Sequence, residues 1–268
     1  MVLGLIVFAI GASVGSFLNV VADRTPAGRS LVSPRSYCSS CKRPIPSSEL
    51  VPVLSYLWLR GRCRQCGAAI PARVVLVEAT TALLFTVVYL RSGFGIEFVV
   101  LASAISLLIV VAVIDFEHQL ILNRIVLPST VVALIVAPFW NELGLSRTFL
   151  GSAGMIASLL NSLVGGLGAF LLFLVIILVY PQGMGGGDVK YAGLLGLLLG
   201  VPGVLLAWWI TAIMGGVVAV FLLAVRKKGR KDAIPYGPFL SLGGIVVLLG
   251  GNDLLSGYQQ MVEKIVGL

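Results

Sequence analysis

Between residues 97 and 114 the chain reads EFVVLASAISLLIVVAVI, and Asp115 follows directly. After its first residue this stretch carries no charged side chain, and its length is close to the roughly 20 apolar residues with which a helix crosses a bilayer. A helix satisfies its backbone hydrogen bonds internally, as the hydrocarbon core of a membrane requires. The stretch therefore predicts a transmembrane helix.

Further apolar runs occur along the whole chain, and together they predict an all-α polytopic membrane protein with about eight transmembrane helices. They lie near residues 1–22, 74–91, 125–139, 156–180, 187–200, 203–225 and 238–252. Val201-Pro202-Gly203 predicts a turn between two of them, because proline lacks an N–H donor and glycine tolerates reversed dihedral angles. Residues 187–225 could instead form one long run with a break.

The composition supports a membrane protein and argues against a soluble domain. Of the 268 residues, 58% are hydrophobic and 11% are charged, whereas a soluble domain carries about 25% charged residues. The 32 glycines suit membrane helices, in which small residues let backbones approach closely. The net charge of +8 comes mainly from two loops, which indicates membrane orientation; we expect no nucleic-acid partner.

The two basic loops, residues 23–73 and 226–232, predict the topology. The positive-inside rule puts both in the cytoplasm and the N-terminus outside. They can share a side only if an even number of spans separates them, and six are predicted. The same parity puts Asp115 and Asp188 on the cytoplasmic side of the membrane.

We therefore divide the chain into four parts. They are a first transmembrane helix (1–22), a cytoplasmic basic loop (23–73), a transmembrane core (74–252) and a C-terminal tail (253–268). Apolar residues recur in the tail at helical spacing, which predicts an amphipathic helix at the membrane interface.

One face of the first helix carries Gly11, Gly15 and Asn19 at intervals of four residues. Small residues at this spacing predict close packing against another span, and Asn19 is expected to form a hydrogen bond across that contact.

All four cysteines lie in the first basic loop, as Cys38-x-x-Cys41 and Cys63-x-x-Cys66. Two such pairs are typical of a tetrahedral zinc site, in which each pair supplies two thiolates from one tight turn. A reducing cytoplasm argues against disulfides. We predict a closed, structural zinc site that folds a loop too short to build its own core. Four unligated thiols, or a redox pair, are the alternative.

Two carboxylates stand at the ends of apolar runs. Asp115 follows residues 97–114, and Asp188 follows Gly185-Gly186-Gly187 and opens the next run. Acidic side chains near membrane spans are costly, which favours a functional role. Two carboxylates at one depth can share a proton, so that one activates a water while the other polarises a scissile carbonyl. Asp115 and Asp188 are therefore candidates for a catalytic pair.

Gly185, Gly187 and Lys190 are predicted to support the substrate. Glycines let an extended peptide backbone approach Asp188, because no side chain blocks it. Lys190 could hold substrate or tune the acidic pair, although a lysine in this position can simply extend to the interface.

Other interpretations of the two aspartates remain open. Asp188 could be a helix N-cap after a glycine turn, and Asp115 could be the last residue of a helix meeting water. A different class of function is a membrane transporter or assembly scaffold in which the acidic pair relays protons or ions. That class would require charges near the bilayer midplane and repeated halves.

Five motifs occur in order between residues 15 and 239. They are Gly15-Ser16-Phe17-Leu18-Asn19-Val20 with Arg24 and Pro26, the two CxxC pairs with Leu59-Arg60-Gly61-Arg62-Cys63, Ile114-Asp115, Gly183-Met184-Gly185-Gly186-Gly187-Asp188-Val189-Lys190, and Ile234-Pro235-Tyr236-Gly237-Pro238-Phe239. Gly185 to Asp188 match the GxGD motif of intramembrane aspartyl proteases. The whole series resembles the type IV prepilin peptidases, the bacterial leader peptidase/N-methyltransferases.

The resemblance implies an enzyme of the bacterial inner membrane. Such enzymes cut the leader of type IV prepilins and type II secretion pseudopilins after a glycine on the cytoplasmic side, and Asp115 and Asp188 align with their catalytic pair. Many then methylate the new N-terminal amine with S-adenosylmethionine, and the cysteine loop is typical of members with both activities. The oligomeric state is not implied.

The chain departs from the family pattern in two places. Ile121-Leu122-Asn123 stands where Leu-Pro-Asp is frequent, and Val74-Val75 stands where Tyr-Pro is expected before Glu78. Neither touches the catalytic pair, but the second leaves open whether Glu78 takes part in methyl transfer.

Overall fold

The structure, a computed structural model, describes residues 2–143, 147–181, 184–225 and 235–266. Within the last of these ranges, the side chains at 252, 255, 256 and 258–266 fall outside the description. The second basic loop, 226–232, therefore lies outside the described residues, as do most side chains of the predicted amphipathic tail. The tail backbone is helical as far as Val266.

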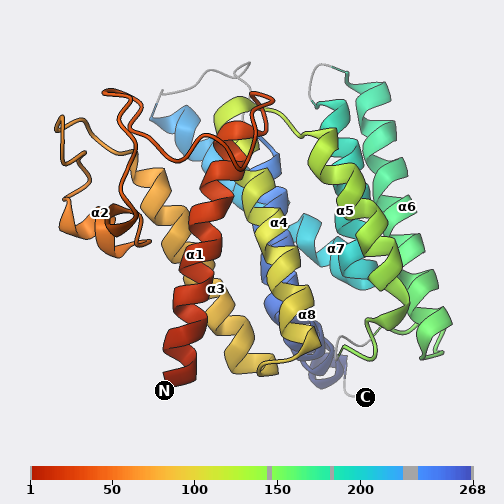
Figure 1. Cartoon of the computed structure of the whole chain (residues 1–268). Coiled ribbons are helices and arrows are strands. Elements are labelled where there is room, and N and C mark those ends of the chain that lie inside the picture. The colour runs from red at the N-terminus through yellow and green to blue at the C-terminus, as the bar shows by residue number, and fades with distance from the viewer. Residues whose placement is uncertain (1, 144–146, 182–183, 226–234, 267–268) are drawn as a thin grey trace. The chain divides into compact units, whose positions relative to one another are not determined.

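Helices account for the regular structure of the described residues, and β-structure is limited to isolated bridges (Figure 1). The α-helices are α1 (Val2–Arg24), α2 (Leu54–Trp58), α3 (Ala72–Ser92), α4 (Ile96–His118), α5 (Asn123–Val136), α6 (Met155–Val179), α7 (Gly186–Ala224) and α8 (Gly237–Val266), with 3-10 helices η1 (Ser47–Glu49) and η2 (Ala137–Phe139). The predicted all-α class is confirmed.

Among the described residues, five helices are long and apolar enough to cross a membrane, namely α1, α3, α4, α6 and α7. Shorter apolar helices cover Asn123–Phe139 and Gly237–Gly251. The run 187–225 forms two helical segments that meet at a kink beside the predicted turn, where Gly200 and Val201 have non-helical dihedral angles. The count of eight spans stays a prediction.

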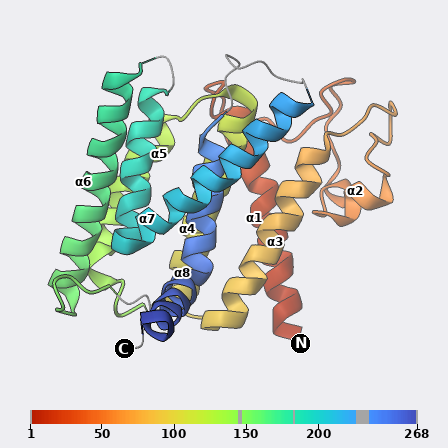
Figure 2. The same cartoon turned by 180° about the vertical axis from the view of Figure 1, so that it is seen from behind.

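The chain forms two compact units, Met1–Val110 (unit 1) and Val111–Leu268 (unit 2). In unit 1, α1 and α3 run side by side (Figures 1 and 2). A Cβ atom added at Gly11 would lie 2.8 Å from the Cα of Ala82, and one at Gly15 would lie 2.7 Å from the Cα of Glu78. Asn19 donates a hydrogen bond to the Val74 carbonyl across the same contact (3.1 Å). The predicted role of this face is confirmed.

In unit 2, α7 contacts α5, α6 and α8. Helices α6 and α7 meet through glycines, since a Cβ atom at Gly165 would lie 2.7 Å from the Gly196 carbonyl oxygen and 3.0 Å from the Gly200 backbone. Helix axes that approach this closely leave no space for side chains between them. The contact fixes the position of α7, which carries Asp188.

The break in α7 is held by polar side chains from α6. Asn161 accepts a hydrogen bond from the Val201 N–H (2.8 Å) and donates one to the Val201 carbonyl (2.7 Å). Backbone groups freed by a helix break need such partners where water is scarce. Gly200 has a φ of 61°, which favours glycine, and a Cβ atom there would collide with the Asn161 side chain.

A buried arginine binds the last carbonyl groups of α7 before the break. Arg147 is only 6% exposed, and its guanidinium donates to the carbonyls of Leu197 and Leu198 and to the Ser162 hydroxyl. It also lies over the Trp140 ring, 4.4 Å from the centroid. A cation at the last carbonyls of a helical segment interacts favourably with the helix dipole.

We expect Gly165→Val to destabilise unit 2, because overpacking of this kind costs about 1–3 kcal/mol. Gly168→Val is a matched control in the same helix, since a Cβ atom at Gly168 meets nothing within 4 Å. Thermal unfolding in detergent should show a lower Tm for Gly165→Val than for Gly168→Val. Equal Tm values would contradict the glycine contact.

Candidate functional site

Asp115 lies in the last turn of α4 and is buried, with 5% of its surface exposed. Its Oδ2 accepts a hydrogen bond of 2.8 Å from the backbone N–H of Gly237, the first residue of α8. A Cβ atom at Gly237 would lie 2.7 Å from the same oxygen. The alternative that Asp115 simply ends a helix in water is wrong, because a second helix covers and binds its carboxylate.

Asp188 is the third residue of α7, and its Oδ2 accepts a hydrogen bond of 3.0 Å from the N–H of Gly185. The N-cap residue of α7 is Gly185, so the interpretation of Asp188 as the N-cap is wrong. The carboxylate instead reaches back over the first turn. It is half-buried, unlike Asp115.

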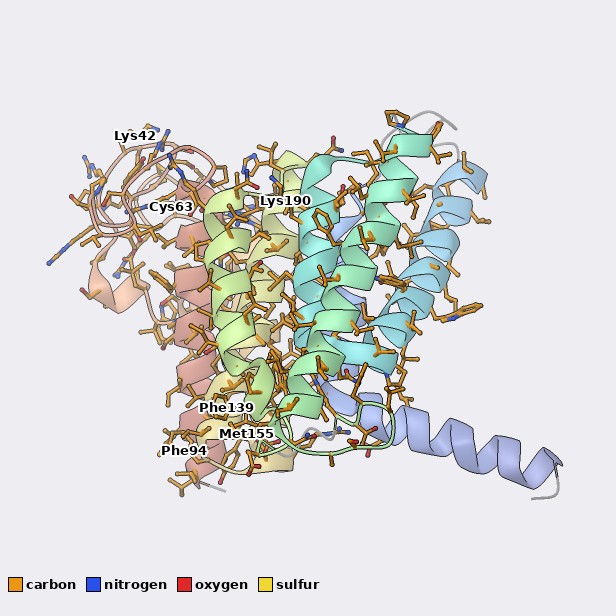
Figure 3. All side chains as sticks on the ribbon, turned by 90° about the vertical axis from the view of Figure 1, so that its right-hand side faces the viewer. Lys42, Cys63, Phe94, Phe139, Met155 and Lys190 are labelled. Carbon is orange, nitrogen blue, oxygen red and sulfur yellow. The ribbon has the colours of Figure 1, made fainter. Side chains whose placement is uncertain are left out.

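The structure brings the two carboxylates together, and their charges interact electrostatically. Both sit at one end of unit 2, where α4 ends, α5 begins and α7 begins. Lys190, two residues after Asp188, lies at the opposite end of this unit from Phe139 and Met155 (Figure 3). Each carboxylate accepts a hydrogen bond from a backbone N–H at the start of a helix, and the start of a helix favours negative charge.

Two tyrosines adjoin the acidic pair, and sequence reasoning assigned a role to neither. Tyr236 directly precedes α8; burial raises the pKa of its phenol, and the charge of Asp188 raises that pKa further. Tyr191 is fully buried and forms a hydrogen bond with Ser241 (2.6 Å), which links α7 to α8. The motif at residues 234–239 was the available signal in the sequence, but only the fold shows that its Gly237 contacts Asp115.

The residues predicted to support the substrate have different surroundings. A Cβ atom at Gly187 would lie 2.8 Å from the Cβ of Ile121, so this glycine accommodates the loop before α5. A Cβ atom at Gly185 would meet only the Asp188 carboxylate and the Gly187 N–H at 3.5 Å or more. Lys190 is exposed and donates a hydrogen bond to the Asn123 side chain (3.0 Å). A role for the three in binding substrate stays a prediction.

The four cysteines gather in unit 1. The Sγ atoms of Cys38, Cys41, Cys63 and Cys66 all lie within 4.8 Å of one another, and those of Cys38 and Cys66 are 3.8 Å apart. A tetrahedral site with Zn–S bonds of about 2.3 Å has sulfur–sulfur edges of about 3.8 Å. The cluster is therefore compatible with structural zinc.

Each CxxC pair forms the same small turn. In the first pair, the Cys38 N–H donates a hydrogen bond to the Arg43 carbonyl, and the Lys42 N–H donates one to the Cys38 carbonyl. In the second pair, the Cys63 N–H donates to the Ala68 carbonyl, and the Gly67 N–H donates to the Cys63 carbonyl. Lys42 and Gly67 take equivalent positions with φ values of 59° and 70°. The loop thus repeats one small turn, although its sequence offers a glycine at only one of the two positions.

The thiols have divergent acidities. Backbone N–H groups, Cys41 first and then Ser40, lower the pKa of Cys38 to about 6. The Ala68 N–H lowers the pKa of Cys66, but burial and the other three sulfurs outweigh it and raise that pKa to about 11. Four thiols this close resist ionising together, and a bound cation would remove that conflict.

Comparison with known proteins places the chain in a family. A family model described as the bacterial peptidase A24 N-terminal domain matches residues 9–92, and one described as the type IV leader peptidase family matches residues 102–220. A protein of Bacillus subtilis named prepilin leader peptidase/N-methyltransferase is 31% identical over 96% of this chain and 98% of its own length. The chain belongs to the type IV leader peptidase family.

Other relatives bear the same name. One from Pseudomonas putida is 33% identical over 94% of this chain and 92% of its own length, and one from Pseudomonas aeruginosa is 32% identical over 94% and 91%. No solved structure matches the chain. Peptidases of the type IV leader peptidase family are aspartic, so an acidic pair is the expected chemistry.

We expect Gly237→Ala to lower peptidase activity about tenfold or more, because losing a hydrogen bond to a charged group costs about 1.5–3 kcal/mol. The added methyl group would push the Asp115 carboxylate away from its N–H donor. Gly216→Ala serves as control, since a Cβ atom there meets nothing within 4 Å. Initial rates of peptide cleavage measure the effect, and equal rates would show that the Gly237 contact is dispensable.

Proposed function

We propose that this chain cleaves the N-terminal leader of type IV prepilins and type II secretion pseudopilins and then N-methylates the new N-terminus. The observation that carries the peptidase assignment is the meeting of Asp115 and Asp188 at one end of unit 2, in a chain of the type IV leader peptidase family. The relatives' shared name supports both activities.

The acidic pair supplies the hydrolytic chemistry. One carboxylate takes a proton from a water molecule, whose oxygen attacks the scissile carbonyl carbon, while the other, protonated, donates a hydrogen bond to the carbonyl oxygen. The C–N bond then breaks, and the leaving amine takes a proton from the pair. The N–H groups of Gly237 and Gly185 hold the two carboxylates in place.

The open side of the Gly185–Gly187 turn is where we place the substrate backbone. Among the described residues, a Cβ atom added at Gly185 would lie within 4 Å of only the Asp188 carboxylate and the Gly187 nitrogen, and one added at Gly186 would meet nothing. An extended peptide can therefore approach Asp188 from this side. Lys190, fixed by Asn123, supports the substrate from the same turn of α7.

The methylation step requires S-adenosylmethionine as methyl donor. The product's α-amine gives up a proton and gains the methyl group as the sulfonium S–C bond breaks, leaving S-adenosylhomocysteine.

The four cysteines hold zinc as a structural ion, which keeps the two turns of the loop together.

The enzyme acts in the bacterial inner membrane with its N-terminus outside. The basic charge of residues 23–73 supports a cytoplasmic cysteine loop. The parity of the spans supports a cytoplasmic location for Asp115 and Asp188 as well, where prepilin leaders are exposed to the enzyme.

We expect Asp115→Asn and Asp188→Asn each to reduce prepilin cleavage by roughly 100-fold or more, the typical contribution of general acid–base catalysis. Asparagine keeps the size of the side chain but can neither take a proton nor supply one. Cleavage of a purified prepilin in detergent, followed by gel mobility, measures the loss.

A peptide that already begins at the mature N-terminus is the control for folding. Both asparagine variants should still methylate it, because they lack only the peptidase step. If either variant cleaves prepilin at the wild-type rate, the assignment of the acidic pair is wrong.

We expect the purified chain to contain roughly one zinc ion, and Cys41→Ser to lose it, because closed structural sites need all four thiolates. Ser39→Ala alters the spacer of the same turn and should keep the metal. Elemental analysis by mass spectrometry reports the zinc content. A wild-type chain free of zinc, after purification without chelators, would contradict the site.

A further inference from the structure

Helix α2, in the loop that carries the cysteines, has an exposed apolar face. Leu54, Leu57 and Trp58 are 66%, 63% and 89% exposed, and Val51, just before the helix, is 45% exposed. We call these four side chains the α2 apolar face. A cluster of exposed apolar side chains marks a surface that binds a membrane, a ligand or another protein. Trp58 favours the first of these, because an indole joins a large apolar ring to an N–H and is enriched at membrane interfaces.

A buried carboxylate fixes the position of α2 along α3. The side chain of Glu78, which is only 5% exposed, accepts a hydrogen bond of 2.7 Å from the N–H of Val53, the N-cap residue of α2. Val53 has a φ of 64°, which a β-branched residue adopts only where its surroundings hold it. Glu78 follows Ala72, the first residue of α3, by six positions, or about 9 Å along the helix axis. Figures 1 and 2 accordingly show α2 beside the first turns of α3.

Charged side chains mark the level at which α1 and α3 leave the membrane. Arg73, in the first turn of α3, donates a hydrogen bond of 2.6 Å to Asp23, in the last turn of α1. Charged groups at the ends of membrane spans lie at the level of the lipid headgroups. The start of α2 is held about 9 Å further along α3, and amphipathic helices lie about 5–10 Å into the boundary between headgroups and acyl chains. The depth of α2 is therefore that of an interfacial helix.

The charges around α2 favour an anionic lipid surface. Residues 51–71 contain three arginines and no acidic side chain. Arg64 forms an ion pair with Glu49 (3.4 Å), while Arg60 and Arg62 are exposed directly after the helix. Arginine can lay its apolar stem along acyl chains and keep its guanidinium among the headgroups, and clustered basic residues beside a span attract anionic lipids.

We propose that α2 inserts its apolar face into the bilayer leaflet at this end of α1 and α3, with Arg60 and Arg62 on anionic headgroups. Under the proposed topology this is the cytoplasmic leaflet. The inserted helix is a third attachment of the cysteine loop to the membrane, besides α1 and α3, and it holds the loop against the bilayer surface. The inference goes beyond the proposed reaction and does not depend on it.

The test measures quenching of Trp58 fluorescence in the full-length chain. The protein is placed in nanodiscs of phosphatidylcholine and phosphatidylglycerol whose acyl chains carry bromine near the headgroup. The chain has four tryptophans, so the Trp58 signal is the difference between the wild type and Trp58→Phe. Brominated lipids should quench this difference signal, and iodide added to the aqueous phase should leave it unchanged.

Two variants serve as controls. Arg43→Trp combined with Trp58→Phe moves the tryptophan to an exposed position next to Lys42, at the far end of the loop from α2 (Figure 3). Its emission should respond to iodide and not to brominated lipids. Leu54→Glu combined with Leu57→Glu should release α2, so that Trp58 loses quenching by lipid and gains quenching by iodide. Because both leucines are exposed, these changes remove little packing within unit 1.

Wild-type Trp58 that is quenched by iodide and not by brominated lipids would overturn the proposal. If added prepilin then shields Trp58 from iodide, the α2 apolar face docks a protein substrate instead. Quenching by lipid that persists in the double glutamate variant would also contradict the proposal, because the apolar face would not be what holds α2 in the leaflet.

Prepilin cleavage and methylation in the same nanodiscs report on the proposed function separately. A chain that is inactive but shows quenching of Trp58 by lipid keeps this inference and contradicts the proposed function. A chain that is active but shows no such quenching contradicts only the inference.

Discussion

The hydrogen bond from the Gly237 N–H to the Asp115 carboxylate is the contact on which the acidic site depends. A carboxylate that is 95% buried among apolar helices is costly unless a donor compensates it. The first N–H groups of a helix have no intrahelical acceptor, so the start of α8 has a donor available. Meeting this need brings the end of α4 against the start of α8, although more than 100 residues separate them.

The same solution recurs at Asp188, which accepts the Gly185 N–H at the start of α7. Both carboxylates thus lie at the positive ends of helix dipoles, where a negative charge is tolerated best. This shared arrangement lets two acidic groups approach one another at the edge of a membrane bundle. It also explains why glycines precede or begin both helices: a side chain at Gly237 would displace the Asp115 carboxylate, and one at Gly187 would displace Ile121.

The site also depends on contacts far from the carboxylates. Helix α7 is fixed by the glycine contact with α6, and its break is held by Asn161 and Arg147 at the other end of the helical segment. The segment Gly186–Leu199 is a continuous helix, so these contacts near its C-terminal end help to set the position of Asp188 at its start. Unit 1 is organised differently, by a glycine-lined helix pair and a loop that four cysteines draw together.

Apolar runs, loop charges and the two CxxC pairs were sufficient to predict the helical membrane class, the cysteine cluster and the meeting of the two aspartates at one end. These features are local: hydrophobic length, charge and ligand spacing can each be seen within a short stretch of chain. The partners of the aspartates were not visible, because Gly237 and Tyr236 reach them only through contacts between helices that are distant in the sequence. The position of Asp188 within α7 and the packing role of Gly187 likewise came from tertiary packing, which no periodicity in a single stretch can report.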